Sequence, residues 1–432
     1  MKMKQGRVSF SVVGLGGRAS AYLSALQEFY PDQYIVAAVA DPDKQKQARV
    51  KSEYALSDNQ IFETDLDLMQ QPRLSDVAMV TTQDRFHLRE IQGLLAKGYD
   101  LILEKPVATS LEDLEEVAAL SRQYPNQMVA VCHVLRHTPL FSELRRIIDS
   151  GKFGPVVSIQ HNENVGYYHF AHSYVRGPWR KASESGPVIL TKSCHDMDIL
   201  LYLLGNRHCR RLSSFGSLSV FRRDNYDPKT MAPTCVDCPQ KDSCAYSAIR
   251  LYGSGKIKSV VFDLSSVDKI RENLGSSPYG RCVYCCDNDV ADHQSTAIEF
   301  EGGVTATFNL SAFSAKVNRT LKIMCQYGEI RAMEKPYLIE TTDFRTDETV
   351  SRELETYGSG HGGGDRQFIR DFMESYLHGT PFNSTLDQAI ESHAMALLAE
   401  ESRMHNGAPK DVENWMQRQG EYGKGKGHCA KI

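Results

Sequence analysis

The chain has 432 residues, more than one hydrophobic core normally serves, so two domains are expected. Apolar residues make up 41% and charged residues 24%, an ordinary balance for a globular protein. The net charge of −4, with both signs interspersed, argues against a nucleic-acid surface and a polybasic membrane anchor. The sequence has no apolar run of about 18 residues and no signal-peptide core after MKMKQGRVSF. We therefore expect a cytoplasmic protein without membrane or nucleic-acid partners.

The first part of the chain alternates apolar strands with helical patterns, which is typical of a parallel α/β sheet. Strands are expected at 8–13, 34–40, 77–82, 101–103 and 128–132. Helical periodicity is expected at 19–29, around 88–95 and at 110–124, the last beginning with a capping pattern at Ser110 and Asp113. The pattern predicts a Rossmann-like domain over residues 6–132.

After residue 132 the pattern changes to longer, half-exposed strands, which are typical of a mainly antiparallel open sheet. They are expected in VVSIQHNENV, RLSSFGSLSVF, TAIEFEGGVTATFNLSAF and TLKIMCQYGEI. Two amphipathic helices follow, around Gln367–His378 and Leu386–Met404. We expect a second, α/β domain over 133–410, with a Cys-rich insertion near 226–288 and a tail at 411–432.

A glycine turn joins the first strand to the first helix. Gly14, Gly16 and Ala19 have G-x-G-x-x-A spacing, and Gly17 and Arg18 complete the turn. The first glycine allows the tight turn, the second lets the backbone approach a pyrophosphate, and the helix N-terminus favours its charge. The same turn occurs in α/β proteins that bind no nucleotide, so the motif indicates dinucleotide binding only together with the residues around it.

That context is Asp41, which ends the second strand, where an acid can accept hydrogen bonds from ribose hydroxyls. The carboxylate favours NAD as cofactor. Arg18 and Lys44 are close enough in sequence to leave NADP possible.

Two further motifs carry groups that can move a proton. Glu104 and Lys105 follow the strand 101–103, and ligands of open α/β sheets bind beyond the carboxyl ends of the strands. Elsewhere, a Glu-Lys pair at a strand end is usually a solvated charge pair.

His195 and Asp198 lie three residues apart on one helix face. A lone helical histidine is more often structural, but Asp198 could orient and tune this imidazole.

With these residues the chain resembles the Gfo/Idh/MocA family, named after glucose–fructose oxidoreductase, inositol dehydrogenase and rhizopine catabolism. The matching pieces are GLGGRA, Asp41, the run VTTQDRFHLREIQGLLAKGYDLILEKP and the H-x-x-D at His195. The likeness extends from Val8 to about Asn406, and the run ending in EKP is its specific part. It implies a Rossmann domain, an α/β domain whose open sheet often forms a dimer interface, an active site between them, and a homodimer or homotetramer.

The resemblance also implies residue roles. In the family, the lysine matching Lys105 and the histidine matching His195 bind the reacting hydroxyl and handle its proton. Many members have an aspartate four residues before that histidine, where this chain has Thr191, so Lys192 is a further catalytic candidate. Cofactor contacts are expected from the matching run at Thr82, His87, Glu104 and Lys105.

Several polar and aromatic side chains lie together in HNENVGYYHFAHSYVRGPW. This mixture suits a carbohydrate, whose hydroxyls need directional partners and whose ring faces are apolar, although an ordinary polar loop has a similar composition. HGGGD at 361–365, where glycines allow close backbone approach, is a second candidate segment. The candidate substrate-binding residues are Glu163, His172, Tyr174, Arg176, Trp179 and Asp198.

The eleven cysteines of a cytoplasmic protein should be thiols or metal ligands. Cys235, Cys238 and Cys244 form C-x2-C-x5-C, and RCVYCC supplies Cys282, then Cys285, as a fourth ligand. This pattern predicts a structural zinc bound by four thiolates. An iron–sulfur cluster and a set of unrelated free thiols are the alternatives.

Together these features predict an NAD-dependent oxidoreductase that transfers hydride between nicotinamide and a ring hydroxyl of a sugar, inositol or glycoside. One alternative is redox-neutral cleavage of a glycoside through a transient keto-sugar, with NAD staying bound. Another is a non-catalytic dinucleotide sensor, against which the pair Lys105 and His195 argues, because a sensor needs no proton-handling groups.

Overall fold

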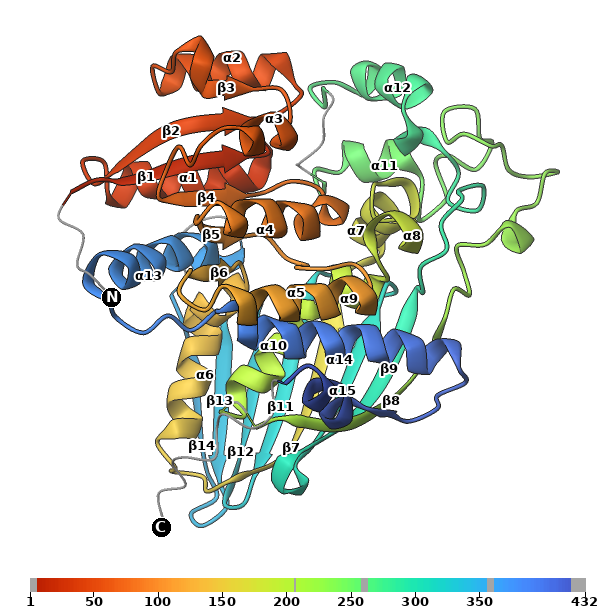
Figure 1. Ribbon diagram of the computed structural model, residues 1–432. Coiled ribbons are helices and arrows are strands. Elements are labelled where there is room, and N and C mark those ends of the chain that lie inside the picture. The colour runs from red at the N-terminus through yellow and green to blue at the C-terminus, as the bar shows by residue number, and fades with distance from the viewer. Residues whose placement is uncertain (1–5, 206, 258–262, 356–360, 421–432) are drawn as a thin grey trace.

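Figure 1 shows the computed structural model, which describes residues 6–205, 207–257, 263–355 and 361–420. The N-terminal part forms a parallel six-stranded sheet in the order β3-β2-β1-β4-β5-β6. Its strands are β1 (Val8–Val13), β2 (Tyr34–Ala40), β3 (Ile61–Phe62), β4 (Val77–Val80), β5 (Asp100–Leu103) and β6 (Val129–Val131). The five predicted strands are confirmed to within two residues at each end. The two-residue β3 was not predicted, because so short a strand has no periodicity.

The helices of this part follow the strands in βαβ alternation. They are α1 (Gly17–Phe29), α2 (Lys44–Glu53), α3 (Asp65–Gln70), α4 (His87–Ala96) and α5 (Leu111–Gln123). Side chains cap three of them: Asp43 accepts the N–H groups of Gln45 and Lys46, Thr64 accepts that of Asp67, and Ser110 accepts that of Asp113. The central strands β1 and β4 are almost wholly buried, which is why they appear in the sequence as continuous apolar runs.

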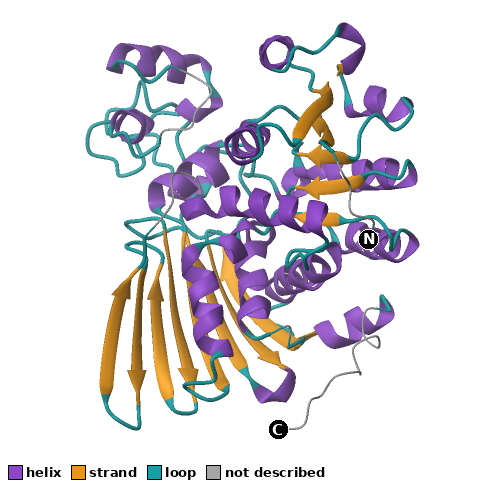
Figure 2. Cartoon of the chain, turned by 90° about the vertical axis from the view of Figure 1, so that its left-hand side faces the viewer, coloured by secondary structure: helices purple, strands orange, loops and turns teal. Residues whose placement is uncertain are grey.

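The larger sheet has nine strands in the order β14-β13-β12-β11-β7-β10-β9-β8-β15, and its pairs are antiparallel except for β7 with β10. The strands are β7 (Val156–Asn164), β8 (Cys209–Ser217), β9 (His293–Phe300), β10 (Thr305–Ser311), β11 (Asn318–Cys325), β12 (Gly328–Met333), β13 (Leu338–Asp343), β14 (Glu348–Glu353) and β15 (Lys410–Asp411). Burial alternates along β9, β10 and β11, so one face is covered and the other is open. In Figure 2 these strands lie side by side at the lower left, away from the smaller sheet. The predicted combination of a Rossmann sheet and a large, mainly antiparallel sheet is confirmed.

Three helices cover the buried face of this sheet: α6 (Pro139–Asp149), α10 (Cys194–Leu203) and α14 (Leu386–Met404) (Figure 1). Shorter helices connect the strands or lie in the Cys-rich insertion, namely α7 (Tyr167–Phe170), the π-helical turn η4 (Ala171–Arg176), α8 (Ala182–Ser185), α9 (Val188–Thr191), α11 (Ala248–Gly253) and α12 (Val267–Ser276). No helix in the described part of the chain is long and apolar enough to cross a membrane.

The C-terminal helices return to both sheets. α13 (Gly364–His378) packs on α1 and β1, with the rings of Phe372 and Phe10 6.4 Å apart. α15 (Val412–Arg418) packs on β8 and α14 and buries Trp415, so the predicted tail is wrong for its first part. Residues 421–432 of that tail lie outside the described residues.

Candidate functional site

The glycine turn after β1 has the shape that a dinucleotide needs. Gly14 has φ +88°, and a Cβ on it would lie 2.7 Å from the carbonyl oxygen of Thr81, so only glycine fits. Gly16 is the N-cap of α1 without a side-chain cap, and the space beside Gly16 and Gly17 is open. The free N–H groups at this helix start can therefore bind a pyrophosphate.

Asp41 closes the turn from the end of β2. Its carboxylate accepts the backbone N–H of Leu15 at 2.7 Å and that of Asp43 at 2.8 Å, and the side chain is largely buried. The ammonium of Lys46 lies 3.8 Å away. Asp41 therefore fixes the turn and brings negative charge to the position where a ribose is expected.

Arg18 and Glu104 contact each other rather than an open cofactor surface. The Arg18 guanidinium lies 2.6 Å from Glu104 and 2.8 Å from Asp365 of α13. Glu104 also accepts the Tyr22 hydroxyl. Burial raises the pKa of Glu104, but Arg18 and Lys105 outweigh this and hold it below its usual range. Both residues tie α1, the end of β5 and α13 together, and their predicted cofactor role stays a prediction.

Thr82 and His87 also make internal contacts. The hydroxyl of Thr82 donates to Glu90 at 2.6 Å, and Nδ1–H of His87 donates to the carbonyl oxygen of Pro106 at 2.7 Å. On the other side of the same loop, Nε2 of His393 accepts the N–H of Val107. The hydrogen bonds of His87 and His393 hold the loop that carries Lys105.

Lys105 and His195 are brought into one place. The ammonium of Lys105 donates to the carbonyl oxygen of Thr191 at 2.9 Å. His195 is 4% exposed, and its ring lies 5.5 Å from that of His133 and 5.9 Å from that of His361. Burial, and then the charge of Lys105, hold the pKa of His195 well below its usual range. The imidazole is therefore neutral beside a lysine ammonium.

Asp198 does not partner His195, contrary to the prediction. Its carboxylate binds both arms of the Arg136 guanidinium at 2.7 and 2.6 Å, and both side chains are buried. Nδ1 of His195 is buried without a hydrogen-bond partner among the described residues. Asp198 neutralises a buried arginine in this structure, and its predicted substrate contact stays a prediction.

Lys192 lies over a buried acid. Its ammonium is 3.6 Å from Glu163, whose other carboxylate oxygen is 2.6 Å from Arg319. Glu163 is fully buried and lies beneath Lys192, and its predicted substrate contact stays a prediction. Burial and then the charge of Lys192 lower the pKa of His169 to about 3, which places a neutral imidazole beside this ammonium.

Tyr174 and Trp179 form an aromatic wall, with ring centroids 6.3 Å apart. The indole N–H of Trp179 donates to Asp84 at 3.2 Å, which joins this wall to the Rossmann sheet. Burial raises the pKa of Asp84, although the Lys105 charge opposes it. Asp84 was missed in the sequence, although it lies in the run after β4 that carries the family resemblance.

His172 and Arg176 lie against the insertion. Nδ1 of His172 is hydrogen-bonded to the Tyr252 hydroxyl at 2.7 Å, and its ring stacks on Tyr279 at 4.8 Å. Arg176 is 1% exposed and donates to backbone carbonyl oxygens of the insertion. The polar atoms of both residues are used inside the insertion, so their predicted substrate contacts stay a prediction.

The four predicted zinc ligands, Cys235, Cys238, Cys244 and Cys282, line one pocket of about 210 Å³. Within the described residues, however, no group of three or more His, Cys, Asp or Glu side chains is arranged to hold a metal ion. The structure therefore does not show the predicted four-thiolate zinc site.

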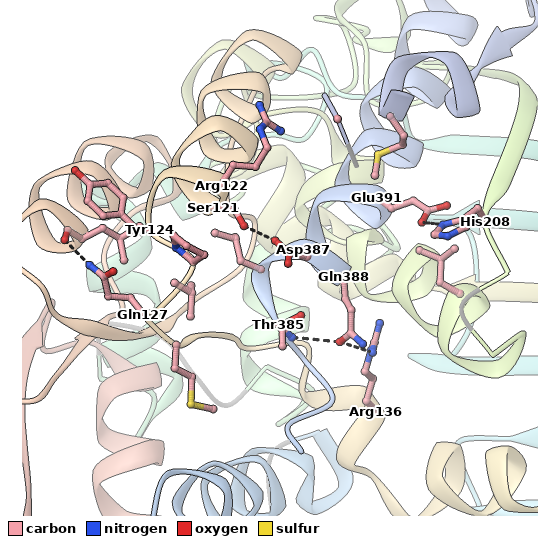
Figure 3. Close-up of a pocket in the computed structure, with 18 residues that line it drawn as sticks. Ser121, Arg122, Tyr124, Gln127, Arg136, His208, Thr385, Asp387, Gln388 and Glu391 are labelled. Atoms are coloured by element: carbon pink, nitrogen blue, oxygen red, sulfur yellow. Dashed lines mark hydrogen bonds and ion pairs between the residues drawn. The ribbon is translucent and has the colours of Figure 1, made fainter. Parts of the chain in front are cut away.

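A larger pocket of about 540 Å³ lies between α5 and α14 (Figure 3). Figure 3 shows Ser121 facing Asp387, and His208 facing Glu391 at 2.8 Å. Neither Lys105 nor His195 lines it, so it is separate from the candidate site.

Comparison with known proteins agrees with this geometry. Residues 8–133 match the model of an oxidoreductase family with an NAD-binding Rossmann fold, and residues 145–410 match its C-terminal alpha/beta domain. The putative oxidoreductase YteT of Bacillus subtilis is 25% identical over 83% of this chain and 87% of its own length. The scyllo-inositol 2-dehydrogenase (NAD(+)) of the same organism is 25% identical over 46% of this chain and 54% of its own.

Among solved structures, levoglucosan dehydrogenase in complex with NADH and levoglucosan has a similar fold, with a TM-score of 0.69 and 14% identity over 94% of this chain and 99% of that one. The two family matches together span most of the chain and both of its sheets. The chain belongs to the Gfo/Idh/MocA family of NAD-binding oxidoreductases.

Proposed function

We propose that the protein is an NAD-dependent dehydrogenase or reductase acting on a ring hydroxyl of a sugar, inositol or glycoside. The observation that carries this proposal is the meeting of a lysine ammonium and a neutral histidine, Lys105 and His195, beyond the end of β5. This is the edge of the parallel sheet where the glycine turn also lies, and where ligands of such sheets bind.

The residues around the turn fit NAD. Gly14, Gly16 and the start of α1 would hold the pyrophosphate, and Asp41 would accept hydrogen bonds from the ribose. The bound nicotinamide supplies the hydride acceptor or donor.

Lys105 and His195 handle the proton of the substrate hydroxyl. The Lys105 ammonium, held by the Thr191 carbonyl oxygen, donates a hydrogen bond to the reacting oxygen and stabilises negative charge on it. The neutral imidazole of His195 accepts the hydroxyl proton during oxidation and returns it during reduction. Lys192 lies close to Glu163 and His169 and is a second cation for substrate oxygens.

A ring-shaped substrate fits the remaining walls. Trp179 and Tyr174 offer aromatic surface for an apolar ring face, while Asp84 and Lys192 supply an acceptor and a donor for hydroxyl groups. Redox-neutral glycoside cleavage uses the same residues, because it also begins with oxidation of a ring hydroxyl.

A substrate screen tests the function. The protein is incubated with NAD and with sugars, inositols and glycosides, and NADH, keto products and released aglycones are measured. We expect NADH to accumulate with an equal amount of keto product. Aglycone release without NADH would instead establish the redox-neutral reaction, and no turnover of any ring hydroxyl compound would contradict the proposal.

Replacing either Lys105 or His195 should strongly lower turnover without affecting cofactor binding. We expect Lys105→Ala and His195→Ala each to lower kcat by about 10²-fold or more, because each removes a group that acts on the reacting oxygen. His378→Ala, at an exposed histidine of α13, is the control and should keep full activity. Near-normal turnover of either variant, with NADH affinity retained in both, would remove that residue from the mechanism.

On the acid side, kcat/KM for oxidation should begin to fall at a lower pH than it would with a histidine of ordinary pKa. His195 must be neutral to accept a proton, and burial lowers its pKa, so the active form persists below the usual value of about 6.5. We expect kcat/KM for oxidation to change little between roughly pH 7.5 and 6. A wild-type profile that falls with an apparent pKa near about 6.5 would contradict this assignment.

The cofactor preference should be NAD over NADP by about tenfold or more in calorimetry, because the Asp41 carboxylate repels a 2′-phosphate. Lys46→Ala should widen the preference, since its ammonium lies 3.8 Å from that carboxylate. Lys44→Ala is the matched control, because Lys44 pairs with Glu63 instead. Tighter binding of NADP would disprove the role given to Asp41.

A further inference from the structure

The segment HGGGD at 361–365 brings a partly exposed imidazole to His195. His361 belongs to the 3₁₀ turn η8 (His361–Gly363), which leads into α13, whereas His195 lies on α10. The centroids of the two rings are 5.9 Å apart. His361 therefore lies next to a candidate catalytic residue, although the reaction proposed above does not use it.

The glycines of this segment let it pack closely against the rest of the chain. Gly362 has φ +62°, and a Cβ on it would collide with the hydroxyl of Tyr337. A Cβ on Gly364 would collide with the carbonyl oxygen of Val134. His361 itself has φ +39°, a conformation that favours glycine, and a larger residue kept in such a conformation indicates that its side chain is used. The packing therefore fixes the position from which the imidazole projects.

Asp365 orients the imidazole of His361. The Nδ1 atom lies 3.1 Å from one carboxylate oxygen of Asp365 and 3.3 Å from the other. Burial raises the pKa of Asp365, but His361 and Arg18 outweigh this and hold it well below its usual range. An ionised carboxylate only accepts hydrogen bonds, so Nδ1 of His361 carries the hydrogen that it donates. The other ring nitrogen, Nε2, is left for another partner.

Nε2 of His361 is open to a ligand. It makes no hydrogen bond within the described residues, and 38% of the side chain is exposed, against 4% of His195. Rings 5.9 Å apart can each bind an oxygen of their own. The two oxygens of a vicinal diol are about 3 Å apart, close to the length of a hydrogen bond. The two imidazoles are therefore spaced for neighbouring hydroxyl groups of one ring.

We propose that His361 binds the hydroxyl group next to the one that is oxidised, so that the enzyme acts on vicinal diols. The proposal rests on the function proposed above, because Lys105 and His195 must hold the first hydroxyl. The second hydroxyl donates to Nε2 of His361 and keeps its proton, while Asp365 holds the ring through Nδ1. A substrate that lacks this hydroxyl leaves Nε2 without a partner and is held less firmly against His195.

The test uses the full chain with NAD, a sugar or inositol that it oxidises, and the two analogues in which one neighbouring hydroxyl is replaced by hydrogen. We expect kcat/KM of one analogue to be lower by at least about tenfold, because one hydrogen bond is lost. His361→Ala should lower kcat/KM of the parent compound by a similar factor. It should change that of the poor analogue little, since the bond is already absent there. A variant that merely disturbs the fold would lower both values alike.

Two further variants and a binding measurement complete the test. His361→Gln keeps a side chain that can form a hydrogen bond and should retain part of the preference for the parent compound. His378→Ala, near the other end of α13, should retain all of it. NADH affinity, measured by fluorescence, should be the same in each variant as in the wild type.

Three results would overturn the proposal: an unchanged preference in His361→Ala, an equal loss with parent and analogue, or wild-type turnover of both analogues as fast as the parent. The third result decides even if His361→Ala fails to fold. All three leave the dehydrogenase function standing. A wild-type protein that oxidises no ring hydroxyl compound would contradict both proposals.

Discussion

The geometry of the candidate site depends on one ion-pair group, in which the partly exposed Arg18 binds the buried carboxylates of Glu104 and Asp365. Arg18 lies in the first turn of α1, directly after the glycine turn, and Glu104 precedes Lys105 at the end of β5. The guanidinium therefore fixes the distance between the glycine turn and Lys105. Asp365 adds the start of α13, whose aromatic residues pack on β1 and α1. Replacing any one of these three residues should destabilise the fold, because the remaining charges would lose their partner while staying largely buried.

The absence of an acid at position 191 changes the chemistry around His195. A carboxylate beside this histidine would stabilise an imidazolium, whereas Thr191 offers only its backbone carbonyl oxygen to Lys105, and its hydroxyl donates to Pro187. The positive charge of Lys105 and the burial of the ring then both act against protonation of His195. In the proposed mechanism His195 would thus be a weak base, and the neighbouring ammonium would have to lower the pKa of the substrate hydroxyl.

Local patterns in the sequence predicted the elements but not their long-range partners. The strands, the glycine turn and the helices α13 and α14 follow from periodicity and turn chemistry within short windows. The contacts of Arg18 with Asp365, and of Arg136 with Asp198, join residues that no local pattern relates. No short window of sequence could therefore show that Arg18 pairs with Asp365 or that Asp198 pairs with Arg136. Asp84 was missed because only the fold brings it to Trp179.

The segment Ala171–Arg176 links the candidate site to the cysteine pocket. Its π-helical turn places Tyr174 against Trp179, while His172 and Arg176 contact the insertion from the other side. Because π-helical turns lack the regular hydrogen bonding of α-helices, this segment depends on its neighbours for its shape. Stacking of His172 on Tyr279 and the bonds of Arg176 to backbone oxygens supply that support. Order in the insertion therefore determines the position of the aromatic wall that a ring substrate would contact, although no cysteine lies in the wall itself.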